Sequence, residues 1–295
     1  MKTSAVIRIV AFSVAIFLLS LILINTIDQN YYFENGRLRH YTNVEQDSVD
    51  PTAGQITQYH FPTDIRNLEI EWVAGSIRIE HRPNVERIYI SEHYSNDITQ
   101  TMICRQSGQT LKIQFCEDAV HFSSIGINRE ISKDLVIVVP ENWNCNDLEI
   151  DAAAAEVNIQ NISIRELDFD GASGNLILDN CNIVNLDIDT ASGDVYFSGM
   201  LETLDCDAAS ADCRIEVSNI PRSIRIDGLS GDLELILPPD AGFTCNLDTM
   251  SGSFDTDFEF GMHDDTYIFG NGDCEIKVSA MSGDVSILKG ISNFK

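Results

Sequence analysis

The sequence predicts an all-β fold, a parallel β-solenoid with about 19 residues in each turn. Three observations carry this prediction. A short segment recurs at nearly constant spacing through the second half of the chain, apolar residues fall at every second position within it, and no helical apolar stripe follows the N-terminal apolar run. Units this short cannot bury an apolar face alone, so they are expected to stack on one another.

Five copies of the repeat follow one another without a gap, and a weaker and a terminal copy extend the series. They begin at Leu148, Leu167, Leu186, Leu204, Ile224, Cys245 and Ile276. In the third copy, LDIDTASGDVYF, Leu186 and Ile188 precede a polar corner, and Val195 and Phe197 follow it. This is the period of strands with one buried face. Each copy therefore predicts two short strands separated by a corner, and parallel stacking predicts right-handed connections.

A Ser-Gly pair marks the corner in most copies. A sharp bend between strands needs a positive φ, which glycine reaches without a steric clash. The glycines expected at structural corners are Gly174, Gly193, Gly231, Gly252 and Gly283. Ala155 and Ala211 replace glycine in two copies, so those corners are expected to bend differently or to be strained.

Composition and pattern divide the chain into four regions. Residues 1–27 are a transmembrane anchor or signal segment, 28–54 a polar linker, 55–140 an N-terminal β cap, and 141–295 acidic solenoid repeats with a C-terminal cap. The N-terminal cap is expected to contain one early turn, from Asn67, and a hairpin that turns at 106–109. An insertion between Ser251 and Ser282 is expected to cap the other end. Such caps protect the open strand edges of a solenoid.

The N-terminal apolar run from Ala5 to Ile24 is long enough for a membrane-spanning helix, which needs about 20 residues. No small-residue cleavage pattern follows it, so an uncleaved anchor is expected in preference to a removed signal peptide. Lys2 and Arg8 lie before or within the start of this run, and no positive charge follows closely. This predicts a single-pass cell membrane protein whose C-terminal domain is extracellular.

The chain is strongly acidic, with 46 acidic and 19 basic residues and a formal charge of -27. Most of the excess lies in residues 141–290, which contain 30 acidic and 6 basic residues. Such a charge repels a phosphate backbone and excludes nucleic acid as the expected partner. A cell-envelope component or a cationic ligand is expected in its place.

Several segments together resemble a bacterial β-strand-repeat family described as candidate adhesins, a domain of unknown function. The resemblance lies in EWVAGSIRIE, DLVIVVP, LSGDLELILPPDAGF and EIKVSAMSGDVSI, and it covers about residues 55–290. It is specific in its repeat spacing and in the step from Pro239 to Phe243. The resemblance implies a surface-exposed or membrane-tethered scaffold, in some relatives associated with cell-envelope stress, and no catalytic residue. The many cysteines and the two corners without glycine depart from the family pattern.

Stacking the repeats predicts a column of aspartates at the position before the corner. Its members are Asp151, Asp170, Asp189, Asp207, Asp227 and Asp248. Neighbouring strands lie about 4.8 Å apart, so such a row of like charges needs compensation. In one interpretation each aspartate accepts hydrogen bonds from the amides of its own corner. In the other the column binds calcium or a cationic peptide, although the glycine-rich nonapeptide of calcium-binding β-rolls is absent.

An envelope polysaccharide lyase or hydrolase is the competing hypothesis, since parallel β-helices host enzymes that use paired carboxylates. Here carboxylate pairs recur in every turn, which indicates a structural device, because an active site is normally a singular departure from a repeat. The departure is Arg225, which stands in an otherwise acidic column beside Asp205 and Asp227. An ion pair explains it. The sequence therefore predicts a non-catalytic protein without a cofactor or a metal site.

The eight cysteines show no C-x-x-C or zinc spacing. Cys206 and Cys213 fall where other copies have isoleucine, valine or leucine, which predicts buried thiols that pack as small apolar side chains. Disulfides between turns stay open as an alternative, because an oxidising exterior would permit them.

Overall fold

The computed structural model describes residues 31–34, 37–40, 42–43, 56–94, 101–116, 132–263 and 266–290. The predicted membrane anchor lies outside these residues, and within them no helix is long and apolar enough to cross a membrane. Three short strands fall in the segment predicted to be a linker: β1 (Tyr31–Glu34) and β2 (Arg37–His40), which pair antiparallel, and β3 (Thr42–Asn43).

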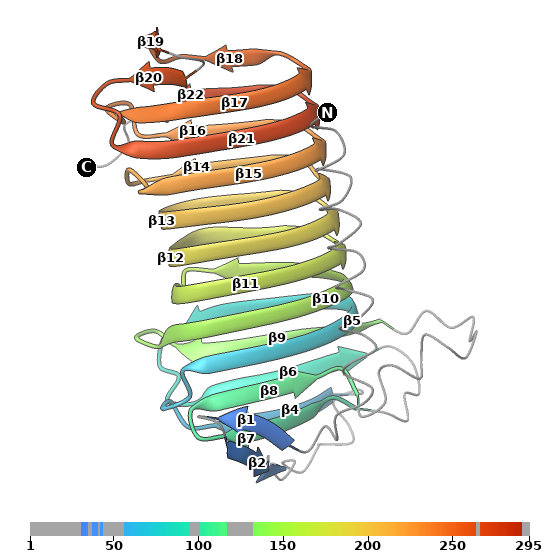
Figure 1. Cartoon of the computed structure of the whole chain (residues 1–295). Coiled ribbons are helices and arrows are strands. Elements are labelled where there is room, and N and C mark those ends of the chain that lie inside the picture. Colours follow the sequence, from blue (N-terminus) through green and yellow to red (C-terminus); the bar gives the residue numbers. More distant parts are fainter. Residues whose placement is uncertain are drawn as a thin grey trace, which may run out of the picture.

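The body of the molecule is a stack of parallel strands, which Figure 1 shows from the side. It contains β10 (Asn144–Gln160), β11 (Ser163–Ser173), β12 (Leu176–Ser192), β13 (Val195–Ser210), β14 (Cys213–Val217), β15 (Ser223–Ser230) and β16 (Leu233–Leu237). The copies pair in register, so that Leu148 lies beside Leu167 and Leu167 beside Leu186. The all-β, mostly parallel architecture predicted from the repeat is confirmed.

Each coil has two main faces that meet at the predicted corner. The first face is made of the segments before the corner, such as 147–152 in β10, 185–190 in β12, and β15. The second face is made of the segments after it, such as 157–160 in β10, 195–199 in β13, β14 and β16. Alternate residues point inward from both faces, and Ile150, Ile188 and Phe197 are fully buried. These inward columns form one continuous core.

The N-terminal cap consists of β4 (Ile56–Phe61), β5 (Asn67–Arg82), β6 (Ile88–Tyr94), β7 (Ile103–Ser107), β8 (Thr110–Gln114) and β9 (Lys133–Pro140). The strand β5 is the early turn that the sequence predicted, and it pairs parallel with β10 on both faces. The hairpin of β7 and β8 extends the first face, while β9, β6 and β4 extend the second.

The last two repeats stack in exchanged order. They contain β17 (Phe243–Ser251), β18 (Phe254–Thr256), β19 (Phe260–His263), β20 (Thr266–Phe269), β21 (Cys274–Ser282) and β22 (Val285–Lys289). The final strands β21 and β22 lie between the coil of β15 and β16 and that of β17 and β18. The prediction that copies stack in chain order is therefore wrong at this end. The insertion makes this order possible. It places β20 beside β17 and β19 beside β20, and it is long enough for the chain to reach β21, which lies between β15 and β17.

All eight cysteines are buried, and for Cys206 and Cys213 this confirms the prediction from their positions in the repeat. Cys206 and Cys245 are fully buried in the inward columns, where they replace branched apolar residues. The side chains act as small apolar groups in the core.

Candidate functional site

The first face carries five of the predicted aspartates side by side. Register places Asp151, Asp170, Asp189, Asp207 and Asp227 in one column, which we call the face ladder. Asp248, predicted as its sixth member, is separated from Asp227 by Ser279. The reason is the exchanged order of the last two coils, which inserts β21 between β15 and β17.

A second carboxylate column runs beside the face ladder. It contains Glu69, Glu149, Asp168, Asp187 and Asp205 in the order of the stack. Arg225 and Lys277 continue it beyond Asp205, and Lys112 precedes Glu69. Basic side chains therefore bound the acidic surface at both ends, and its middle contains carboxylates alone.

Three rungs of the face ladder lack a hydrogen-bonded or ion-paired side chain among the described residues. Within the part of the chain that the structure describes, the carboxylates of Asp151, Asp170 and Asp189 form no hydrogen bond or ion pair, and their own corners donate nothing to them. The interpretation that these aspartates cap their corners is therefore wrong. Each one points outward from the first face, because side chains alternate along a strand, and so it points away from the corner amides.

Burial, reinforced by repulsion between neighbouring carboxylates, raises the pKa values of Asp151, Asp170, Asp189 and Asp207 in the face ladder. Burial, reinforced by repulsion from Glu149 and Asp170, raises the pKa of Asp151 to about 7. Burial and the neighbouring aspartates raise the pKa of Asp189 to about 6. Burial likewise raises the pKa of Asp207 to about 6, although Arg225 lowers it. A cation placed against the ladder would stabilise charges that Lys112 and Arg225 compensate only in part.

A second ladder, of one asparagine and four aspartates, follows the corner and was not predicted from the sequence. Its members are Asn175, Asp194, Asp212, Asp232 and Asp284, which we call the corner ladder. Each accepts a hydrogen bond from a backbone amide of the next coil. The amide of Asp232 donates to Asp212 Oδ1 at 2.8 Å, and that of Asp284 donates to Asp232 Oδ1 at 2.8 Å. The signal was present, because a polar residue directly follows the corner residue in each of these copies.

The corner glycines have the conformation that the bend requires. Their φ values lie between 109° for Gly174 and 126° for Gly252. They also have no room for a side chain, since a Cβ at Gly193 would lie 2.1 Å from the carbonyl oxygen of Gly174 in the preceding coil. Among the described non-glycine residues, positive φ occurs at three asparagines, so the corners at Ala155 and Ala211 bend without it.

Arg225 is held by three carboxylates of the two columns. Its guanidinium lies 2.6 Å from Asp205 Oδ1, 3.8 Å from Asp207 Oδ1, and in direct contact with Asp227. These contacts match the ion-pair interpretation of this residue.

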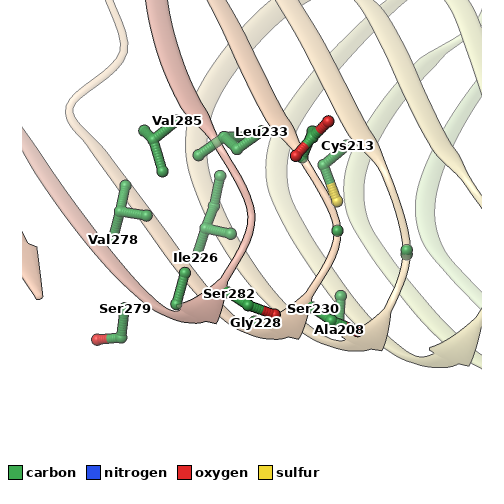
Figure 2. Close-up of a pocket in the computed structure, with 14 residues that line it drawn as sticks. Ala208, Cys213, Ile226, Gly228, Ser230, Leu233, Val278, Ser279, Ser282 and Val285 are labelled. Atoms are coloured by element: carbon green, nitrogen blue, oxygen red, sulfur yellow. The ribbon is translucent and has the colours of Figure 1, made fainter. Parts of the chain in front are cut away.

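In the described ranges no group of three or more histidine, cysteine, aspartate or glutamate side chains is arranged to hold a metal ion. A cavity of about 20 Å³ lies near the corner of the exchanged coil, where Figure 2 shows Ile226, Val278 and Leu233 among its lining residues. It has room for one water at most. A surface groove of about 330 Å³ runs past Asn144, Asn182 and Met200.

The stacked coils with strand caps at both ends define a solenoid of repeated β-strands. The chain belongs to the toastrack DUF4097 family, whose pattern matches residues 63–288. The resemblance to the bacterial strand-repeat family is thereby confirmed.

Solved structures of low identity are similar to this chain. A candidate cell adhesion protein from Clostridium sporogenes is 12% identical, with a TM-score of 0.38, over 80% of this chain and 99% of that one. A candidate lipid binding protein from Parabacteroides distasonis is 13% identical, with a TM-score of 0.37, over 82% and 99%. A candidate adhesin from Bacteroides fragilis is 10% identical, with a TM-score of 0.34, over 81% and 100%. A search of the curated proteins found no match. At these TM-scores the structures carry no argument about function.

Proposed function

We propose that this protein is a non-catalytic, adhesin-like scaffold at the cell surface that binds a cationic component of the cell envelope through its face ladder. Residues 1–27 tether it to the membrane as a single span, and the right-handed solenoid lies outside the cell. The observation that supports the binding role is that, among the described residues, the carboxylates of Asp151, Asp170 and Asp189 form no hydrogen bond or ion pair. Some members of the family that this sequence resembles are associated with cell-envelope stress, and we include such a role for this protein in the same proposal.

The physical argument concerns the free energy of ionising the face ladder. Crowded carboxylates whose charges nearby cations compensate only in part are costly to ionise, as the raised pKa values of Asp151 and Asp189 indicate. A ligand whose positive charges are spaced like the rungs of the face ladder lowers this free energy at several carboxylates at once. Binding of this kind is expected to weaken as salt is added, because exposed charges are screened.

The test measures binding of the full-length protein, purified in mild detergent, to cell-wall fragments and to a lysine-rich peptide. The triple variant Asp170→Asn, Asp189→Asn and Asp207→Asn removes three face charges. The control, Glu156→Gln, Glu202→Gln and Glu216→Gln, removes three exposed charges elsewhere. The proposal predicts at least about tenfold weaker binding for the face variant alone. Equal loss in both variants would show that only net charge matters.

A parallel arm with calcium separates a peptide ligand from a metal ligand. Calcium prefers arrays of carboxylate oxygens. Stabilisation of the wild-type protein by millimolar calcium, absent in the face variant, would favour the calcium alternative over a polycation.

The absence of catalysis is tested by incubating the protein with envelope polysaccharide and assaying for reducing or unsaturated sugar ends. The proposal predicts no release. Release that disappears in an Arg225→Ala variant would establish the competing lyase or hydrolase. Membrane topology is tested by treating intact cells with protease, which should degrade the solenoid and leave cytoplasmic markers intact.

A further inference from the structure

The C-terminal end of the solenoid exposes an unusual number of apolar side chains. Of the seven large apolar side chains that are exposed in the described residues, four belong to β17, β19 and β20: Met250, Phe260, Met262 and Ile268. Phe260 is 52% exposed and Met262 62%. Exposed apolar groups that cluster in this way mark an interaction surface more often than isolated ones do.

Two of these side chains lie on the core-facing side of the sheet. Register pairs Phe260 with Phe269 and Met262 with Tyr267, and paired residues of antiparallel strands share a face. Phe269 is buried against Phe243, with ring centroids 4.0 Å apart, so this face is continuous with the core. Phe260 in turn lies 5.2 Å from Tyr267.

Phe260 and Met262 are exposed beside the buried core because, in the described residues, the two faces end at different levels. The first face extends past β17 by two strands, β20 and β19, whereas the second face ends at β18. In the described part of the chain β18 pairs with β22 along one edge, and no strand pairs with its other edge. Figure 1 shows β18, β19 and β20 together at this end of the stack.

We propose that this end docks an extended strand of a partner protein, whose apolar side chains alternate with basic ones. The strand pairs with the open edge of β18, which is the usual mode of β-augmentation. Its inward side chains cover the apolar shelf, defined as Phe254, Phe260, Met262 and Tyr267. The tilted rings of Phe254 and Tyr267, 5.3 Å apart, form the floor of that shelf.

The exposed carboxylates near β18 indicate which side chains the outward face of the docked strand carries. Asp255 points outward from β18, and Asp257 and Glu259 follow it as exposed carboxylates. Outward side chains of a docked strand lie beside Asp255, so lysine or arginine fits there. A second copy of this chain would bring the same carboxylates together, and like charges at close range repel. The site is separate from the face ladder and does not depend on the function proposed above.

The experiment measures binding of two labelled peptides to the full-length protein in mild detergent by fluorescence anisotropy. One peptide alternates valine and lysine, and the other has the same composition in two blocks, so both carry the same charge. The shelf variant combines Phe260→Ser and Met262→Ser. Its matched control combines Val184→Ser and Met200→Ser, a pair that is 44% and 49% exposed away from this end.

The proposal predicts that the alternating peptide binds at least about tenfold more tightly than the block peptide, and that the shelf variant alone loses this preference. Asp255→Lys, which leaves the shelf intact, is expected to weaken binding of the alternating peptide about as much as the shelf variant does. Equal affinity for both peptides, or a preference that survives in the shelf variant, would overturn the proposal. Dimerisation of the wild-type protein, or adsorption to phosphatidylcholine vesicles, that depends on Phe260 and Met262 would also overturn it, in favour of a second copy or a lipid surface.

Discussion

Two columns of acidic residues run along the same coils and differ in what their carboxylates contact. In the corner ladder one side-chain oxygen of each member accepts a hydrogen bond from a backbone amide of the next coil, as Asp212 does from Asp232. In the face ladder, Asp189 lies between Asp170 and Asp207, and none of the residues that the structure describes donates a hydrogen bond to it. The corner ladder therefore contributes to the stability of the stack. The face ladder costs stability and retains free binding capacity, which is the usual sign of a functional surface.

The largest expected effect tests the corner on which this contrast depends. Gly193→Ala would place a Cβ 2.1 Å from the carbonyl oxygen of Gly174, at a φ of 111°. We expect a loss of about 4 kcal/mol or more in the free energy of unfolding, measured by urea denaturation. The control is Gly261→Ala, where a Cβ meets no atom within 4 Å. A variant as stable as wild type at position 193 would mean that the coils do not stack at this distance.

The next effect is the pH dependence of stability. The folded-state pKa of Asp151, about 7, lies above its usual value of 3.8. The folded chain thus binds a proton that the unfolded chain releases, so this stabilisation is complete below about pH 4 and is lost as the pH rises to 7. Asp151→Asn is expected to flatten the slope and to raise the free energy of unfolding at pH 8 by about 2 kcal/mol, a figure already reduced for solvent screening. Thermal melts between pH 4 and 8 measure both. A profile identical to wild type would contradict the raised pKa.

Removal of a rung of the corner ladder has a smaller and opposite effect. Asp212→Ala leaves the amide of Asp232 without its 2.8 Å acceptor, at a cost of about 1 kcal/mol. Asp212→Asn keeps the acceptor, as Asn175 does for Asp194, and is expected to be close to neutral. If alanine and asparagine destabilise equally in urea denaturation, the hydrogen bond is not what position 212 contributes.

The smallest effect is expected at Arg225. Its guanidinium is 42% exposed, and exposed ion pairs contribute less than about 1 kcal/mol. Arg225→Gln should change stability little and raise the pKa of Asp207 above its value of about 6, because Arg225 lowers that pKa. Carboxyl NMR titration measures the change. A pKa of Asp207 that stays the same would show that the ion pair does not form in solution.

Much of the coil could be predicted from the sequence. The apolar period of two specified which side chains point inward, and the cysteines in those positions, such as Cys206, are buried. The need for positive φ indicated Gly193 and its counterparts as corners. These features are local, and a repeat displays them several times.

The order of the coils and the roles of the aspartates could not be predicted in the same way. A repeat shows which residues share a column, but not which coil comes next, so it predicts Asp248 beside Asp227, where the structure has Ser279. Asp189 and Asp194 are both acidic and both close to one corner. They differ in side-chain direction, because one precedes the bend on the outward face and the other follows the glycine, within reach of the next coil.

Carboxyl titration of a single sample tests the contrast between the two ladders most directly. NMR of the protein with labelled aspartate side chains would follow Asp189 and Asp284 together. We predict that Asp189 titrates with a pKa of about 6, raised by burial and neighbouring carboxylates. Asp284, which accepts hydrogen bonds from the amide and hydroxyl of Ser253, should have a pKa below its usual value. Titration of both groups at one common, unshifted value would contradict the account.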